Sequence, residues 1–147
     1  MPSNFNYEEF IAKDSKEVFE LISNFEDYKN FLPGCTKSEI LSETQDYDIG
    51  RLNFTFFNKD YFIESKNSKM PTELNIEQLK GPFNSLNASW KVIKKDSGCL
   101  VVFFVEFNAP FLLRPFMQQS LIDTFASKFI SAFLKNIKTY KSTQLSA

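Results

Sequence analysis

The 147-residue chain contains no histidine at all. This absence excludes Ser-His-Asp and Cys-His nucleophile pairs, histidine-ligated zinc and acid–base catalysis by imidazole. The two cysteines, Cys35 and Cys99, lie far apart and form no C-x-x-C pair. Neither a disulfide framework nor a cysteine metal site is therefore expected. We interpret both as reduced, buried, small apolar residues of a cytosolic protein.

Positive charge and long apolar runs are also scarce. The net charge is −1 and the isoelectric point is near 5.5, so no overall positive field attracts nucleic acid. Arginine, the side chain best suited to binding phosphate, occurs only as Arg51 and Arg114. The longest strongly apolar run, residues 100–105, is far shorter than the ~20 residues of a membrane-spanning helix. The first residues show no apolar signal-peptide core, so we expect a cytoplasmic protein.

Phenylalanine, in contrast, is abundant. It occurs 18 times, although hydrophobic residues at 43% and charged residues at 24% are typical of a soluble domain. This excess indicates a need for aromatic surface beyond that of an ordinary core. No repeat, low-complexity tract or linker divides the chain, so we predict a single domain over residues 1–147.

Apolar periodicity predicts an α+β domain. Residues 4–11 alternate like a strand, and Asp14 with Glu17 is typical of a helix start. A short second helix is expected over residues 25–31, because Leu32 precedes Pro33 and avoids the helical region. Six further strands are expected over residues 36–44, 50–57, 60–68, 72–80, 85–94 and 99–108, with short turns that favour an antiparallel meander. The last third, from Pro110 or Arg114 to Tyr140, is predicted to form one long helix.

This order of elements predicts two layers. A seven-stranded antiparallel sheet curls around the long C-terminal helix, two short helices follow the first strand, and a cleft lies between sheet and helix. The helix face expected to point at the sheet carries Ile122, Ala126, Phe129, Phe133, Ile137 and Tyr140, flanked by Phe125 and Ile130.

Three segments of the chain resemble one known family. They are residues 28–36 (YKNFLPGCT), the turn Gly81-Pro82-Phe83 followed by Leu86 and Trp90, and residues 129–133 (FISAF). In this order and spacing they resemble the coenzyme Q-binding branch of the START-like (polyketide cyclase-like, SRPBCC) superfamily, whose bacterial members are called ribosome association toxin RatA. The chain departs from the family pattern at Lys29 (usually proline), Val92 (usually aromatic) and Asn136 (usually arginine).

The resemblance implies a helix-grip fold with an apolar cavity between the last helix and the concave face of the sheet. It also implies a non-catalytic carrier of a polyprenyl quinone that supports respiration at the membrane face of the cytoplasm. Ubiquinone would be a bound ligand and not a catalytic cofactor. The alternative function is a RatA-type toxin that binds the large ribosomal subunit and blocks subunit association.

The expected ligand site is an aromatic chamber. Residues 99–108 place Phe103 and Val105 on the concave face, since Glu106 on the other face needs solvent. Residues 28–36 are expected to form a loop over its mouth, with Phe31 and Leu32 as a lid. The predicted ligand-binding residues are Phe31, Leu32, Phe83, Leu86, Trp90, Phe103, Val105, Ala126, Phe129 and Phe133. Two plainer alternatives stay open: the chamber is an ordinary packed core, and residues 28–36 form a corner where helix and sheet pack.

No catalytic residue and no metal ligand is predicted. The acidic residues Asp46, Asp48, Asp60, Glu64 and Glu77 are scattered over strands and turns. Their spacing in the sequence gives no reason to expect two of them together as a general acid and base. The sequence also contains no cluster of residues with metal-ligand spacing and no phosphate-binding loop.

Two outer surfaces are candidates for partners. Leu100, Val102 and Phe104 should face outward, where they would form a homodimer interface or a membrane contact unless a loop covers them. Lys128, Lys135, Lys138 and Lys141 give the last helix a basic flank. Such a flank is an ordinary solvated face, or it contacts anionic lipid headgroups or ribosomal RNA.

Overall fold

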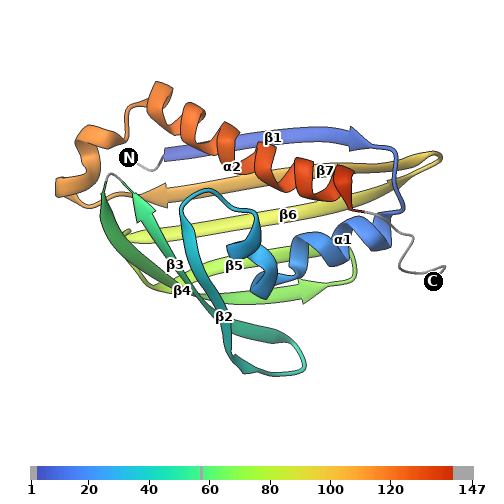
Figure 1. Cartoon of the computed structure of the whole chain (residues 1–147), viewed down its shortest axis with the longest axis horizontal. Coiled ribbons are helices and arrows are strands. Elements are labelled where there is room, and N and C mark those ends of the chain that lie inside the picture. Colours follow the sequence, from blue (N-terminus) through green and yellow to red (C-terminus); the bar gives the residue numbers. More distant parts are fainter. Residues whose placement is uncertain (1–2, 57, 141–147) are drawn as a thin grey trace.

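The computed structural model describes residues 3–56 and 58–140 (Figure 1). In chain order the elements are β1 (Ser3–Ile11), α1 (Ser15–Ser23), the 3-10 helix η1 (Phe25–Asn30), β2 (Cys35–Glu43), β3 (Tyr47–Phe56), β4 (Lys59–Met70), β5 (Glu73–Lys80), β6 (Ser85–Lys95), β7 (Gly98–Asn108), the 3-10 helix η2 (Phe111–Phe116) and α2 (Gln119–Thr139). The seven predicted strands are confirmed to within a few residues. The predicted strand end at Phe57 lies outside the described residues.

The strands form one antiparallel sheet in the order β1-β7-β6-β5-β4-β3-β2. Each pair joins strands that are consecutive in the chain, except that β1 pairs with β7, with Phe5 opposite Val105. In Figure 1 the sheet curls and α2 runs along its concave side. The predicted α+β helix-grip architecture is confirmed.

Local signals fix the corner between β1 and β2. The side chain of Asp14 accepts hydrogen bonds from the backbone N–H groups of Lys16 and Glu17, at 3.2 and 3.3 Å, and so starts α1 as predicted. The buried hydroxyl of Tyr28 donates to the carbonyl oxygen of Ile22, which ties η1 to α1. The Ser38 hydroxyl donates to the Glu26 carbonyl oxygen at 2.9 Å and ties η1 to β2.

The prediction of one long helix from Pro110 or Arg114 is wrong in its first part. Residues 111–116 form η2, and the backbone then extends at Gln118 (φ −66°, ψ 143°) before α2 begins at Gln119. Pro115 has no N–H to donate and disfavours the α conformation at Arg114. A single α-helix therefore does not continue through this segment.

The buried face of α2 is wider than the helix face that was predicted to point at the sheet. Its buried residues are Ile122, Ile130, Phe133, Leu134 and Ile137. Ala126 and Phe129 are half-buried, whereas Tyr140, predicted on the inner face, is exposed beyond the helix end. Both α1 and β1 also pack against α2, so the helix is covered on more than one side.

Both cysteines are free thiols, as predicted. Cys99 is buried, but Cys35 is half-exposed at the start of β2, so the expectation of two buried cysteines is wrong there. Burial raises the pKa of both thiols, which favours the unreactive protonated form.

Candidate functional site

Six aromatic side chains form a continuous cluster between α2 and the sheet. This ring cluster consists of Tyr28, Phe31, Trp90, Phe103, Phe129 and Phe133. Ring centroids lie 4.6 Å apart for Trp90 and Phe103, and 4.8 Å apart for Trp90 and Phe133. The rings meet in tilted or edge-to-face arrangements, which aromatic pairs prefer.

Strand register and helix spacing bring these rings together. In the pairing of β6 with β7, Trp90 lies opposite Phe103 and Ala88 lies opposite Val105. On α2, Phe129 and Phe133 are four residues apart and share one side of the helix, with ring centroids 5.0 Å apart. The prediction that Phe103 and Val105 face inward is confirmed.

Burial varies along the inner face of β6 and β7. The pairs Val92–Val101 and Trp90–Phe103 are buried, whereas Ala88 and Val105, one pair further along, are only half-buried. Leu86, in the next pair, is half-buried as well. Phe107, opposite Leu86, and Ile122 on α2 are buried. The inner face is therefore a dry core at the α1 end, and its half-buried positions are Ala88, Val105 and Leu86, between that core and Phe107.

The sequence-predicted residues fall into two groups. Phe31, Trp90, Phe103, Phe129 and Phe133 belong to the ring cluster, and Leu32 and Val105 pack in the same core. Phe83 lies elsewhere, at the β5–β6 turn, with its ring 5.3 Å from that of Phe107. Leu86 lies opposite Phe107 in the β6–β7 pairing, close to this Phe83–Phe107 contact. Ala126 is half-buried on α2.

Tyr28 was missed as a site residue. Its ring contacts Phe31 and Phe133 at centroid distances of 5.9 and 5.1 Å. Burial raises the pKa of its hydroxyl well above the ordinary tyrosine value. The sequence contained a signal for this residue, because Tyr28 is the first residue of the segment 28–36 that also contains Phe31.

A small enclosed hollow lies beside the ring cluster. Its volume is about 10 Å³, and its lining residues are Ser23, Phe25, Tyr28, Asp48, Asn67, Lys69, Leu74 and Ile76. The buried side chain of Asn67 accepts a hydrogen bond from the Ser65 hydroxyl at 2.8 Å, while its amide nitrogen has no partner. A hollow of this size holds about one water molecule. A larger pocket, of about 260 Å³, is lined by Lys66, Ser68, Asn75, Ile76, Glu77, Asn87 and Ala88.

Residues 32–35, in the predicted lid, are tied to β3. The carbonyl oxygen of Gly34 accepts a hydrogen bond from the N–H of Thr55 at 2.9 Å, and Leu32 is buried. Gly34 has φ +77°, a left-handed conformation that glycine adopts without strain. Opening this segment would break the bond to Thr55, and its role as a lid remains a prediction.

One charged contact joins the two layers. The Glu9 carboxylate on β1 accepts hydrogen bonds from Lys138 Nζ on α2 and from the Tyr7 hydroxyl, each at 2.6 Å. These bonds, led by the one from Lys138, lower the pKa of Glu9, and the same carboxylate raises the pKa of Tyr7. Within residues 3–56 and 58–140, no cluster of three or more potential metal ligands occurs, and no helix is long and apolar enough to cross a membrane.

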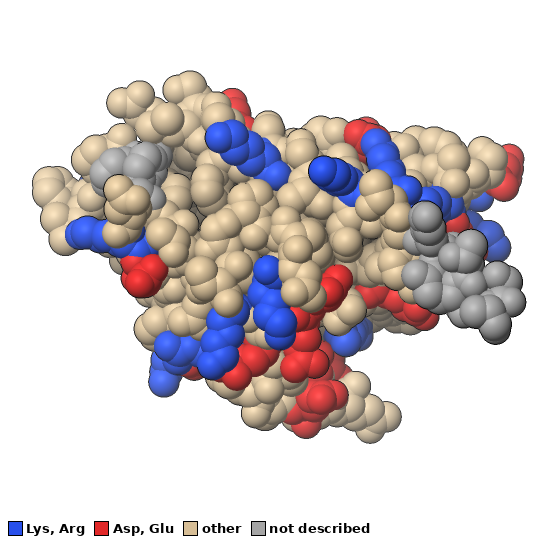
Figure 2. All heavy atoms as spheres, in the orientation of Figure 1, with Lys and Arg blue, Asp and Glu red and all other residues tan. Residues whose placement is uncertain are grey.

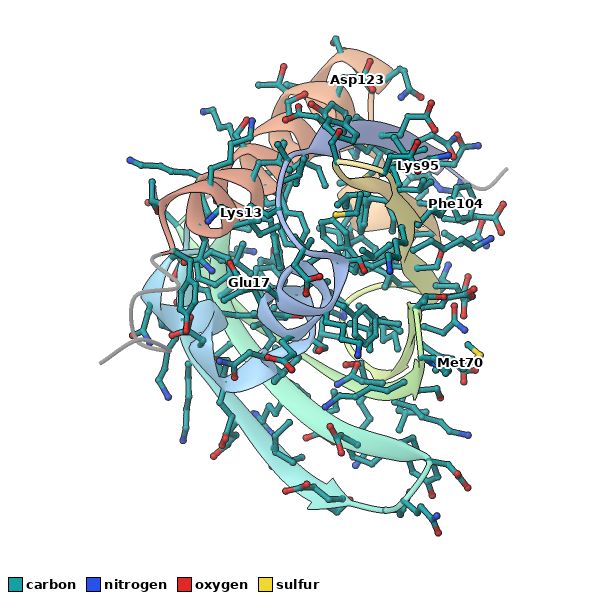
Figure 3. The ribbon with its side chains drawn as sticks, turned by 90° about the vertical axis from the view of Figure 1, so that its right-hand side faces the viewer. Lys13, Glu17, Met70, Lys95, Phe104 and Asp123 are labelled. Atoms are coloured by element: carbon teal, nitrogen blue, oxygen red, sulfur yellow. The ribbon has the colours of Figure 1, made fainter. Side chains whose placement is uncertain are left out.

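The predicted partner surfaces lie on the outside of the molecule. Phe104 projects from the convex side of the sheet, away from α2 (Figure 3), and is half-buried like Leu100 and Val102. Lys128 and Lys135 are exposed on α2, whereas Lys138 is paired with Glu9 and Lys141 lies outside the described residues. A homodimer, membrane contact or RNA contact through these surfaces remains a prediction.

Comparison with known proteins identifies the family. Residues 11–133 match the family model described as polyketide cyclase / dehydrase and lipid transport. The chain belongs to this family. Similar members include the ribosome association toxin RatA of Rickettsia prowazekii, 24% identical over 140 residues that cover 92% of this chain and 96% of that protein. RatA of Escherichia coli K12 is 22% identical over 142 residues, covering 91% and 86%.

Solved structures agree with the helix-grip fold of this family. The Zhui aromatase/cyclase from Streptomyces sp. R1128 matches with a TM-score of 0.81 at 17% identity, and each chain is covered to 94%. A START superfamily protein from Mycobacterium smegmatis matches with a TM-score of 0.73 at 12% identity, covering 97% of this chain and 98% of that one. At such identities the likeness concerns the fold alone.

Proposed function

We propose that this protein binds an apolar isoprenoid, with ubiquinone as the first candidate, between α2 and the inner face of the sheet. The observation that carries this proposal is the change in burial along β6 and β7. A tightly packed ring cluster continues directly into the half-buried apolar residues Ala88, Val105 and Ala126. An apolar ligand seated there would cover surface that now contacts water, at roughly 25 cal/mol per Å².

Binding without chemical conversion fits the side chains of the ring cluster. Tyr28 supplies its only hydroxyl group, which is occupied by the Ile22 carbonyl oxygen and held protonated by burial. General acid–base catalysis needs a group that exchanges protons near the operating pH. The aromatase/cyclase activity named for the Streptomyces protein is therefore not proposed for this chain.

Organic extraction and mass spectrometry of the protein, purified from a quinone-producing host, test this proposal. We expect a prenyl lipid in stoichiometric amount. Ala126→Trp should fill the half-buried position on α2 and abolish uptake of a short-tailed ubiquinone, whereas Ser127→Trp, one residue further on the exposed side, should leave uptake intact. A protein that is empty and takes up no added quinone would contradict the proposal.

A second candidate function is binding to the large ribosomal subunit. It is supported by the name of the relatives, which match this chain over most of their length. The exposed Lys128 and Lys135 on α2 are the side chains best placed to meet RNA phosphates. Co-sedimentation with ribosomal subunits should be lost in Lys128→Glu/Lys135→Glu and retained in Ala126→Trp if this function holds.

A further inference from the structure

One end of the molecule carries its most exposed large apolar side chains. Phe111 and Leu112, both on η2, are 77% and 82% exposed. Leu121 and Phe125 follow on the first turns of α2, 42% and 49% exposed, and the ring of Phe125 meets that of Phe56 at 5.1 Å. We call Phe56, Phe111, Leu112, Leu121 and Phe125 the apolar end surface.

The meander explains why these residues gather at one end. Antiparallel strands alternate in direction, so the β3–β4 turn, the β5–β6 turn and the exit of β7 lie at the η2 end (Figure 1). The other turns, residues 44–46, 71–72 and 96–97, lie at the opposite end, near the labelled Met70 and Lys95 in Figure 3. Those turns consist of Thr, Gln, Asp, Pro and Ser. The two largest apolar exposures, those of Phe111 and Leu112, are thus at the η2 end, whereas Leu41 and Met70, away from it, are 47% and 43% exposed.

We propose that the apolar end surface docks on a lipid bilayer that contains anionic headgroups. Phe111 and Leu112 would enter the boundary between headgroups and acyl chains, as apolar side chains of interfacial helices do. Figure 2 shows mostly uncharged atoms over η2 and the start of α2, with basic and acidic side chains side by side below them.

Charge at this end favours an anionic surface. The Arg114 guanidinium lies 6.0 Å from the centre of the Phe111 ring, and Lys59 and Lys80 are exposed at the neighbouring turns. Asp60 and Asp123 lie at the same end, and Glu64, opposite Lys80 in the β4–β5 pairing, is paired with Arg51. Anionic headgroups attract Lys and Arg side chains that lie near the membrane surface.

A second copy of the chain fits the apolar end surface less well than a lipid bilayer does. Fully exposed Phe and Leu side chains each present on the order of 150–200 Å². At the exposures given above, Phe111, Leu112, Leu121 and Phe125 together offer roughly 400–500 Å². A stable interface covers about 800 Å² on each partner. Insertion into a bilayer needs no such complementary area.

The docking surface adjoins the proposed ligand site. Phe125 lies one helical turn before Phe129 of the ring cluster, at the end of the inner face where Ala88 and Val105 are half-buried. An isoprenoid leaving the bilayer would therefore reach the inner face with little exposure to water. Docking and ligand binding are separate properties, because the surface is exposed whether or not a ligand occupies the interior.

Vesicle flotation tests the docking surface directly. The probes are phosphatidylcholine vesicles with and without phosphatidylglycerol, and the protein is the full chain. We expect wild type to float with anionic vesicles and to be released by high salt. Phe111→Ser/Leu112→Ser should weaken partitioning about tenfold or more, and Arg114→Glu should weaken it on anionic vesicles only.

The matched control is Leu41→Ser/Met70→Ser, which removes two exposed apolar side chains away from η2 and should float like wild type. All these positions are exposed, so the fold should persist, which circular dichroism checks. Equal flotation of both double variants, or no flotation of wild type, would overturn the proposal. Loss of a dimer or of ribosome binding in Phe111→Ser/Leu112→Ser, without vesicle binding by wild type, would assign the surface to that partner instead. Lipid extraction, which tests the proposed ligand site, is independent of each of these outcomes.

Discussion

At the scale of single residues, Tyr28 joins the elements around the ligand site. Its ring lies 5.1 Å from that of Phe25 and 5.1 Å from that of Phe133, and its hydroxyl donates to the Ile22 carbonyl oxygen. One side chain thus connects α1, η1 and α2. Because burial disfavours the charged phenolate, the hydroxyl remains protonated in the folded protein.

Tyr28→Phe should remove the hydrogen bond and leave the Ile22 carbonyl without this partner, at a cost of about 1–3 kcal/mol at neutral pH. The sign of the pH dependence follows from the raised pKa of Tyr28. Its contribution to stability is complete below the unfolded tyrosine pKa of about 10 and is lost above it, by about 1.4 kcal/mol per pH unit. The difference in unfolding free energy between wild type and variant should therefore shrink above pH 10.

Urea denaturation at neutral and alkaline pH measures this difference. Tyr47→Phe, at a half-buried tyrosine of β3, is the matched control for loss of a tyrosine hydroxyl. A difference between wild type and Tyr28→Phe that stays constant into the alkaline range would contradict the assignment.

At the scale of elements, the two α-helices begin in different ways. Asp14 caps α1 with its side chain, whereas Gln118 stands at the same position of α2 and makes no side-chain capping bond. The backbone of Gln118 is already in the extended conformation that N-cap residues adopt. The first turn of α2 also lacks an acidic residue, which would interact favourably with the helix dipole.

Gln118→Asp should therefore stabilise the protein by about 0.5–1 kcal/mol. Chemical denaturation near neutral pH measures the change. Gln118→Ala should be nearly neutral, because the side chain it removes caps nothing, and Asp14→Ala should cost about 1 kcal/mol. Equal stabilities of the aspartate and alanine variants would show that Gln118 is not the effective cap.

The elements also show what could be predicted from sequence. Period-two alternation located the strands, and the four-residue spacing of Phe129 and Phe133 located part of the ring cluster, because both signals are local. The break before α2 was missed because Pro115 is also acceptable in the first turn of a helix. The local preferences of proline therefore allowed a helix that begins near Pro115 as well as one that begins after it.

Part of the site could not be predicted, because it depends on how far the sheet curls. Ala88, Val105 and Phe103 all face inward, yet only Phe103 is buried. Alternation assigns a residue to a face but does not say how closely α2 approaches it. Phe83 was grouped with the ring cluster for the same reason, although its ring packs on Phe107.

At the scale of the whole molecule, ligand binding should appear as thermal stabilisation. A short-tailed ubiquinone at a hundredfold excess over its Kd should stabilise the folded state by about 2.7 kcal/mol. For a chain of this length, that corresponds to a rise in Tm of roughly 5–10 °C. Scanning calorimetry of wild type and Ala126→Trp with the same ligand measures the effect, and an equal rise in both would place the ligand elsewhere.

The strand order also determines the sequence in which contacts form during synthesis. Every neighbouring pair from β2 to β7 is joined by a short turn, so these pairs close with little loss of chain entropy. β1 has its partner in β7, where Ser3 pairs with Phe107. The first strand to leave the ribosome therefore waits for nearly the last, and its alternating Phe5, Tyr7 and Ile11 stay uncovered until most of the chain has emerged. During synthesis, β1 should therefore depend on protection until β7 has emerged.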